Sequence, residues 1–201
     1  MDLAEDSRVL DVGCGTGWAS RMVVRIIPNG EVVGIDFAEG MTQKAKQLTS
    51  KDKAHSYGNL SFKIADVEAI PYPDDYFDCV ICLESLSWFP NPAAGVKEIK
   101  RVLESEGKLY VADIANSSLL RLILKVWKLF LPGLDKCNIH SENQFKDFPE
   151  AEFKDVYQQR GMWLFKLLGE DVLLTVGTKE KVSVAPHMVV EVNNDSIDRH
   201  S

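Results

Sequence analysis

A glycine-rich segment with an acidic residue downstream is the part of this sequence whose residue types and spacing most clearly predict chemistry. The segment reads Asp11-Val-Gly13-Cys14-Gly15-Thr-Gly17 and lies between a β-branched run and a helical pattern. Glycines at such a turn let the backbone approach a ligand closely. Asp36 ends the next β-branched run, 19 residues after Gly17, where a carboxylate can accept hydrogen bonds from ribose hydroxyls. The pattern therefore predicts a site for a ligand that contains a nucleoside.

The spacing within the glycine segment separates this site from two common nucleotide-binding motifs. A dinucleotide fingerprint, G-x-G-x-x-G, would need glycine at position 18, which is Trp18 here. The segment also lacks the Lys-Ser/Thr pair of a phosphate-binding P-loop. A nucleotide-binding oxidoreductase is therefore disfavoured. Asp36 has a second interpretation, as an N-cap of the helix that follows it.

Acidic residues also follow the third and fourth expected strands. Asp66 and Val67 come after the third, and Leu83 and Glu84 end the fourth. In a parallel sheet the carboxyl ends of the strands share one edge, so we expect these residues near the glycine segment. A loop-capping Asx turn is the alternative for Asp66, and a surface acid is the alternative for Glu84.

The elements that position these residues alternate between short β-branched runs and longer helical patterns, which is typical of βαβ units and a parallel sheet. A helix runs from the glycine segment to about Ile27, and Asn91-Pro92 starts another that runs to about Glu104 and is closed by Gly107. The expected parallel strands are Arg8–Val12, Glu31–Ile35, Leu60–Ala65, Phe77–Leu83 and Lys108–Ala112.

The last third departs from this alternation. An apolar helix is expected over 117–131, and Phe153–Phe165 and Asp171–Thr178 form an antiparallel hairpin joined at Gly169-Glu170. We predict an α/β fold, Rossmann-like and doubly wound, with a mostly parallel seven-stranded sheet and a C-terminal antiparallel hairpin strand. One domain spans 1–179, with 114–150 as a helical cap insertion, and 180–201 form a tail.

Composition and charge limit the kinds of partner that we expect this chain to bind. The 201 residues carry 23 basic and 30 acidic side chains, a net charge of −7, and the basic residues are scattered. Nucleic acid is therefore a poor candidate, because phosphate binding needs clustered Lys and Arg. The chain opens on acidic residues without the apolar core of a signal peptide, and the apolar stretch Leu119–Leu131 is too short to span a bilayer. We expect a cytoplasmic protein.

Several other residues have a chemical and a structural interpretation. Cys79 and Cys82 form C-x-x-C, but a three-residue offset on a strand places them on opposite faces, so we predict buried thiols and no metal site. His140 is a candidate general base or a solvated loop histidine. The aromatic residues Trp88, Phe89 and Trp127 line an apolar acceptor pocket or belong to the core.

The segment Val9-Leu-Asp-Val-Gly-Cys-Gly-Thr-Gly17 resembles the first signature of class I S-adenosylmethionine-dependent methyltransferases, close to the small-molecule branch that contains quinone-biosynthesis enzymes. The order of motifs agrees over about residues 8–113. The resemblance implies ribose binding by Asp36 with Phe37 beside it, and adenine contacts at Asp66 and Val67. It places the segment from Leu83 beside the methionine portion of the cofactor, and makes Cys14 a common loop residue.

The resemblance also implies a reaction: in-line transfer of a methyl group from S-adenosylmethionine to a small-molecule acceptor, by alignment and exclusion of water. If the acceptor is a hydroxyl, Glu84 and His140 are the candidate bases. Similar enzymes carry helices before the first strand, whereas few residues precede Arg8 here. The alternative is a non-catalytic, cofactor-binding or partner-stabilising subunit. A homodimer or a partner subunit is a further expectation, and 119–131 could form a lid, a dimer contact or a peripheral membrane contact.

Overall fold

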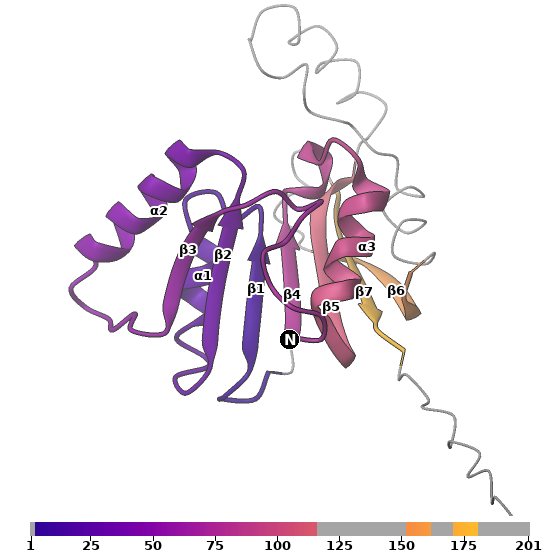
Figure 1. Ribbon diagram of the computed structural model, residues 1–201, viewed down its shortest axis with the longest axis horizontal. Helices are drawn as coiled ribbons and strands as arrows, with labels where there is room; N and C mark the ends of the chain where they lie inside the picture. Colours follow the sequence, from indigo (N-terminus) through magenta and orange to yellow (C-terminus); the bar gives the residue numbers. More distant parts are fainter. Residues whose placement is uncertain (1–2, 116–151, 162–170, 181–201) are drawn as a thin grey trace, which may run out of the picture.

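A seven-stranded mixed sheet forms the centre of the computed structural model, which describes residues 3–115, 152–161 and 171–180. Figure 1 shows the strands side by side in the order β3-β2-β1-β4-β5-β7-β6. The first five strands are parallel, and β7 pairs antiparallel with both β5 and β6. The predicted Rossmann-like α/β fold with a C-terminal antiparallel hairpin is therefore confirmed.

The chain reaches this order by leaving β1 in two directions. It builds β2 and β3 on one side of β1, then returns to place β4 and β5 on the other side. The strands are β1 Arg8–Val12, β2 Glu31–Asp36, β3 Leu60–Ile64, β4 Phe77–Leu83, β5 Leu103–Ala115, β6 Lys154–Gly161 and β7 Asp171–Thr178. The crevice between β1 and β4, where the order reverses, is the usual place for a ligand in such sheets.

Helices cover both faces of the sheet. They are α1 Trp18–Val23, α2 Glu39–Lys51 and α3 Pro92–Val102, with a 3-10 turn η1 at Leu86–Trp88. In Figure 1 α3 lies in front of the sheet and α1 behind it. The helix α2 shares the face of α1, because its Ala45 packs against Phe62 and Cys14 near the start of α1.

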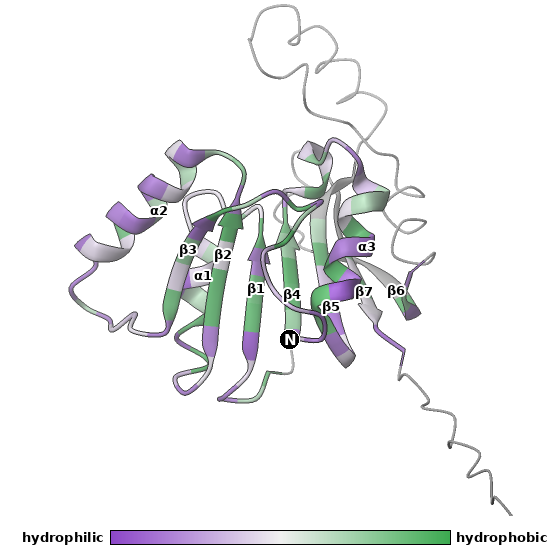
Figure 2. Cartoon of the chain, viewed as in Figure 1, coloured by the Kyte–Doolittle hydropathy of each residue, from purple (hydrophilic) through white to green (hydrophobic). Residues whose placement is uncertain are grey.

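Alternation along the strands divides the core into two layers. Leu10, Val33 and Cys82 pack with α3 on one face, whereas Val9, Val32 and Cys79 pack with α1 on the other. Figure 2 shows hydrophobic residues concentrated on the central strands and hydrophilic residues on the outer side of α2. The predicted placement of the two cysteines on opposite faces is confirmed, and burial raises the pKa of the Cys79 thiol to about 12.

The junction between α3 and β5 differs from the prediction. The helix starts as expected, with the Asn91 side chain accepting a hydrogen bond from Ala94 N and proline at the next position. It ends at Val102 rather than near Glu104, and β5 begins at once with the fully buried Leu103. The pairing with β4 then jumps from Phe77–Leu103 to Cys79–Lys108, so Gly107 lies in a bulge of β5 instead of closing the helix.

Other predicted boundaries shift by a few residues. The helix after the glycine segment ends at Val23 instead of Ile27, and β6 begins at Lys154. The first two residues of the predicted cap, at 114 and 115, belong to β5. The rest of that cap, the 117–131 helix with Trp127, His140 and the tail from 181 onward lie outside the described residues, so they stay predictions.

Candidate functional site

The glycine segment forms a tight turn at the carboxyl end of β1. Gly13, Gly15 and Gly17 all have positive φ, at 67°, 53° and 74°. A side chain at two of them would collide with neighbours: a Cβ on Gly13 would lie 2.3 Å from Ser85 Cβ, and one on Gly17 would lie 2.5 Å from the ring of Phe62. Nothing lies within 4 Å of a Cβ built on Gly15. Gly15 is therefore where a ligand can approach the backbone.

Asp36 faces the same turn from the end of β2. Its Oδ2 accepts a hydrogen bond from Gly15 N at 2.8 Å, and its Oδ1 accepts one from Ala38 N at 2.8 Å. The N-cap of α2 is Ala38, so Asp36 is not the cap that one interpretation proposed. A carboxylate oxygen has two lone pairs, so each oxygen that accepts one of these bonds can accept another from a ligand hydroxyl.

Asp11 supports the turn from beneath. Its carboxylate is 2% exposed and accepts a hydrogen bond from the Ser20 hydroxyl of α1. Burial, partly offset by the Ser20 bonds and assisted by the charge of Asp36, raises the pKa of Asp11 to about 6. Its position indicates that Asp11 ties β1 to α1, and any influence on a ligand acts through the turn.

Cys14 is held inside the turn rather than presented to solvent. Its amide donates to Ile35 O at 2.9 Å, and its side chain is 6% exposed. Burial, together with the charges of Asp11 and Asp36, raises the pKa of the Cys14 thiol far above its usual range. The thiol is therefore unsuited to act as a nucleophile.

The ends of β2 and β3 present the other predicted cofactor residues. Phe37 is 79% exposed directly after β2, so its ring is available to a ligand. Asp66 is exposed after β3, and its Oδ1 accepts a hydrogen bond from Glu68 N at 2.9 Å, the geometry of an Asx turn. Val67 is buried against α3, which leaves its backbone as the part that can meet a ligand.

The end of β4 contains a backbone conformation that is uncommon for a residue with a side chain. Glu84 has φ 54°, its amide donates to Ala112 O at 2.7 Å, and its side chain is exposed. Leu83 before it is half-buried. Such conformations persist where the surroundings fix them, and they concentrate at functional sites. Glu84 is therefore placed at the predicted edge of the sheet, whereas His140 is not among the described residues.

Sequence reasoning missed Ser85, Arg101 and Phe62. Ser85 and Phe62 fill the space that Gly13 and Gly17 leave, and Arg101 fixes the loop that carries Asp66. A serine after a strand, a strand phenylalanine and a helix arginine have no distinctive local pattern. Of the aromatic candidates, Phe89 is a core residue that packs against Gly95, whereas Trp88 is 51% exposed.

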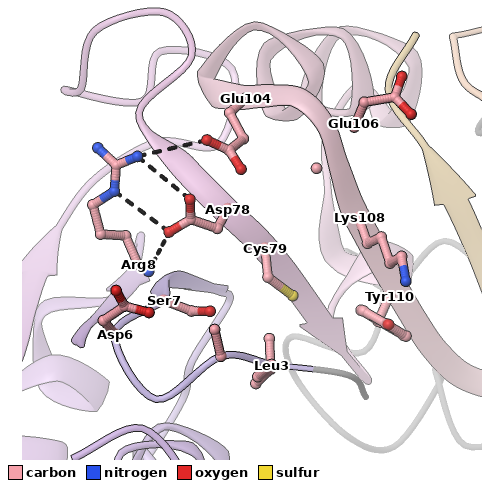
Figure 3. A pocket seen from close by; sticks show the side chains of 12 residues that line it. Leu3, Asp6, Ser7, Arg8, Asp78, Cys79, Glu104, Glu106, Lys108 and Tyr110 are labelled. Carbon is pink, nitrogen blue, oxygen red and sulfur yellow. Dashed lines mark hydrogen bonds and ion pairs between the residues drawn. The ribbon is translucent and has the colours of Figure 1, made fainter. Parts of the chain in front are cut away.

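A separate hollow lies at the opposite, amino-terminal end of the strands, on the face of α1. Figure 3 shows its lining, with Arg8 directed to Asp78 and Glu104 and with Cys79 and Tyr110 below them. Its volume is about 460 Å³. Burial acts to raise the pKa of Asp78, but the bonds from Arg8 outweigh it and lower that pKa. The hollow is far from the glycine turn, so its size does not make it the site.

Among the described residues, no group of three or more His, Cys, Asp or Glu side chains could hold a metal ion. Within the same part of the chain, no helix is long and apolar enough to cross a membrane. The turn at Gly15, the carboxylate of Asp36 and the exposed ring of Phe37 instead fit an uncharged ribose and a flat base. Fold and site together define a Rossmann-like domain that binds a nucleoside-containing ligand.

Comparison with known proteins identifies the family. The family model described as a methyltransferase domain matches residues 3–168. An uncharacterised methyltransferase of Schizosaccharomyces pombe is 33% identical over 103 residues, which cover 50% of this chain and 37% of that protein. The demethylmenaquinone methyltransferase of Staphylococcus aureus is 26% identical over 196 residues, which cover 90% of this chain and 79% of that protein.

Solved structures agree on the fold. A putative methyltransferase in complex with the Haloferax volcanii Trm112 methyltransferase activator superposes with a TM-score of 0.73 and 21% identity, over 90% of this chain and 86% of that one. This chain belongs to the class I S-adenosylmethionine-dependent methyltransferase family. The chain spans 37% of the length of the Schizosaccharomyces pombe relative and 79% of the length of the Staphylococcus aureus relative.

Proposed function

We propose that this domain binds S-adenosylmethionine at the carboxyl ends of β1, β2 and β4 and transfers its methyl group to a small-molecule acceptor by in-line displacement. The hydrogen bond between Asp36 Oδ2 and Gly15 N carries the proposal, because it joins the open glycine to the carboxylate of the neighbouring strand. This contact holds the two ligand-facing groups together before any ligand arrives, which lowers the entropy cost of binding.

Different residues contact different parts of the cofactor. Asp36 accepts hydrogen bonds from the ribose hydroxyls, and Phe37 lies beside the adenosine. Asp66 and the Val67 backbone meet the adenine, whereas Gly13, Gly15 and Leu83 border the methionine portion. When bound, S-adenosylmethionine supplies a methyl group that its sulfonium already activates. The protein therefore needs to align the acceptor and exclude water, without a covalent step of its own.

For the acceptor we propose a hydroxylated aromatic ring. The Staphylococcus aureus relative is named for demethylmenaquinone, and the reduced form of any such quinone is an aromatic ring that carries two hydroxyl groups. In this chain Trp88 exposes its ring just after β4, next to the segment that borders the methyl group. Glu84 lies two residues after Cys82, at the same edge of the sheet, and its side chain is exposed. Among the described residues it is the one best placed to accept a proton from a phenolic hydroxyl.

Titration calorimetry with S-adenosylmethionine and with NAD tests the cofactor assignment. Each charge-assisted hydrogen bond to a ribose hydroxyl contributes about 1.5–3 kcal/mol, so Asp36→Ala is expected to weaken S-adenosylmethionine binding on the order of a hundredfold. The matched control is Asp6→Ala, which removes an exposed aspartate at the opposite end of the sheet and leaves binding unchanged. Equal affinity of wild type and Asp36→Ala for S-adenosylmethionine would remove Asp36 from the site.

The alternative is a cofactor-binding subunit that needs a partner or has no catalytic activity. The Haloferax volcanii neighbour is described in complex with a methyltransferase activator, which makes a partner subunit worth testing. Methyl transfer from labelled S-adenosylmethionine to a panel of quinols, phenols and amines separates the two functions. Turnover with a quinol or phenol supports the enzyme, whereas tight cofactor binding without any turnover favours the subunit.

A further inference from the structure

Ser85 is a buried polar residue two positions after the end of β4, and the proposed function gives it no role. Its side chain is 6% exposed, and its hydroxyl donates a hydrogen bond to Val12 O at 2.7 Å. The same oxygen lies 3.0 Å from Cys82 Sγ. Val12 is the last residue of β1, immediately before Gly13. The hydroxyl therefore joins the end of β4 to the start of the glycine turn.

Ser85 also touches the turn directly. A Cβ built on Gly13 would lie 2.3 Å from Ser85 Cβ and 2.8 Å from Ser85 Oγ. Real Cβ atoms essentially never approach so closely, so the Gly13 backbone and the Ser85 side chain are already in contact. The turn cannot move toward β4 unless Ser85 moves with it.

This contact lies just beyond the last residues at which β1 and β4 are paired in the sheet. The parallel register between β1 and β4 runs from Val9–Cys79 to Asp11–Ile81. Val12 and Ser85 lie beyond its last pair, at the crevice where a ligand enters. The Ser85 hydroxyl thus continues the connection between the strands at the edge that the proposed function uses.

We infer that Ser85 is a positioning residue that sets the distance between the glycine turn and the end of β4, and thereby shapes the methionine half of the cofactor site. The inference rests on the proposed function, in which Gly13 and Leu83 border the methionine portion. The adenosine half is held by Asp36 at the end of β2 and by Asp66 after β3, and within the described part of the chain neither is hydrogen-bonded to Ser85. Loss of the Ser85 hydroxyl should therefore affect one half of the ligand and spare the other.

The test compares two ligands on the whole chain. Titration calorimetry gives the dissociation constants of S-adenosylmethionine and of adenosine for wild type and for Ser85→Ala. Loss of one neutral buried hydrogen bond is expected to weaken S-adenosylmethionine binding about tenfold. Adenosine binding should change by less than about twofold, because adenosine lacks the methionine portion. Ser7→Ala, which removes a buried serine hydroxyl at the other end of β1, is the matched control and should change neither constant.

A second variant guards against a loss of folding. Ser85→Cys keeps a group of similar shape with a weaker donor, so S-adenosylmethionine binding should be intermediate between that of wild type and Ser85→Ala. Thermal unfolding of each variant shows whether it is folded at the temperature of the titration. This measurement keeps the inference testable if the alanine variant is too unstable.

Parallel weakening of both ligands in the Ser85 variants would overturn the inference, since a merely structural role predicts it. If both Ser85 variants bind S-adenosylmethionine as tightly as wild type does, the inference is also wrong. The proposed function would then still stand, because the wild-type protein binds the cofactor. Failure of the wild type to bind S-adenosylmethionine would overturn the proposed function and this inference with it.

Discussion

Replacement of Arg101 by lysine tests how the loop between β3 and β4 is held. The guanidinium donates five hydrogen bonds: two to the carboxylate of Glu98, one to Asp74, and one each to the carbonyls of Tyr72 and Ile70. These bonds use all five N–H groups of the side chain. They fasten the loop to α3, and the same loop begins with the proposed adenine-binding residues.

The structure sets the size of the effect. A lysine ammonium has three donors on one atom and cannot reproduce the planar fork, so at least two of the five bonds are lost. Asp74 is 72% exposed, so its ion pair with Arg101 contributes little. The bonds to the two carbonyls and to the less exposed Glu98 dominate. We expect Arg101→Lys to lower the free energy of unfolding by about 2 kcal/mol, or the melting temperature by about 4–8 °C.

Urea unfolding followed by circular dichroism measures this change. The control is Arg25→Lys, because Arg25 also bonds a carboxylate and a hydroxyl, those of Asp52 and Tyr57, but on the exposed surface. That change should lower the free energy of unfolding much less than Arg101→Lys does, because water and salt screen exposed ion pairs. If Arg101→Lys and Arg25→Lys agree within about 0.5 kcal/mol, the guanidinium does not hold the loop as argued.

Two further predictions concern the glycine turn. Because the pKa of Asp11 is raised to about 6, above its value of about 3.9 in the unfolded chain, the contribution of Asp11 to the free energy of unfolding should fall as pH rises between those values and stay lower by about 2–3 kcal/mol at neutral pH. Asp11→Asn should lack this contribution and be the more stable protein at pH 7.5 but not at pH 3.5; a difference in the free energy of unfolding between Asp11→Asn and wild type that stays constant over this range would contradict the argument. Gly17→Ala should destabilise the fold by at least about 2 kcal/mol because its Cβ meets Phe62, whereas Gly15→Ala should cost only the strain of a positive φ, about 1 kcal/mol. In calorimetry, however, Gly15→Ala should weaken S-adenosylmethionine binding at least about tenfold. Equal dissociation constants for Gly15→Ala and wild type would show that no ligand approaches Gly15.

Local patterns predicted the parts of the fold that depend on neighbouring residues. The buried strands, the N-cap at Asn91 and the opposite faces of Cys79 and Cys82 follow from periods and caps that operate within a few residues. The end of α3 did not follow from such a pattern. Leu103 pairs with Phe77 of β4, so the chain enters β5 at Leu103 instead of continuing the helix. Long-range pairing thus overrode a local glycine signal.

The sequence by itself determined the class of this protein, because a glycine turn after one strand and an acid after the next are set by short, ordered motifs. Only the tertiary structure decided how these motifs cooperate. It brought Asp36 onto Gly15, placed Ser85 against Gly13 and gave Arg101 three partners in a distant loop, Ile70, Tyr72 and Asp74. Those contacts join residues that are far apart in the chain, so their geometry depends on strand order and packing rather than on any local preference.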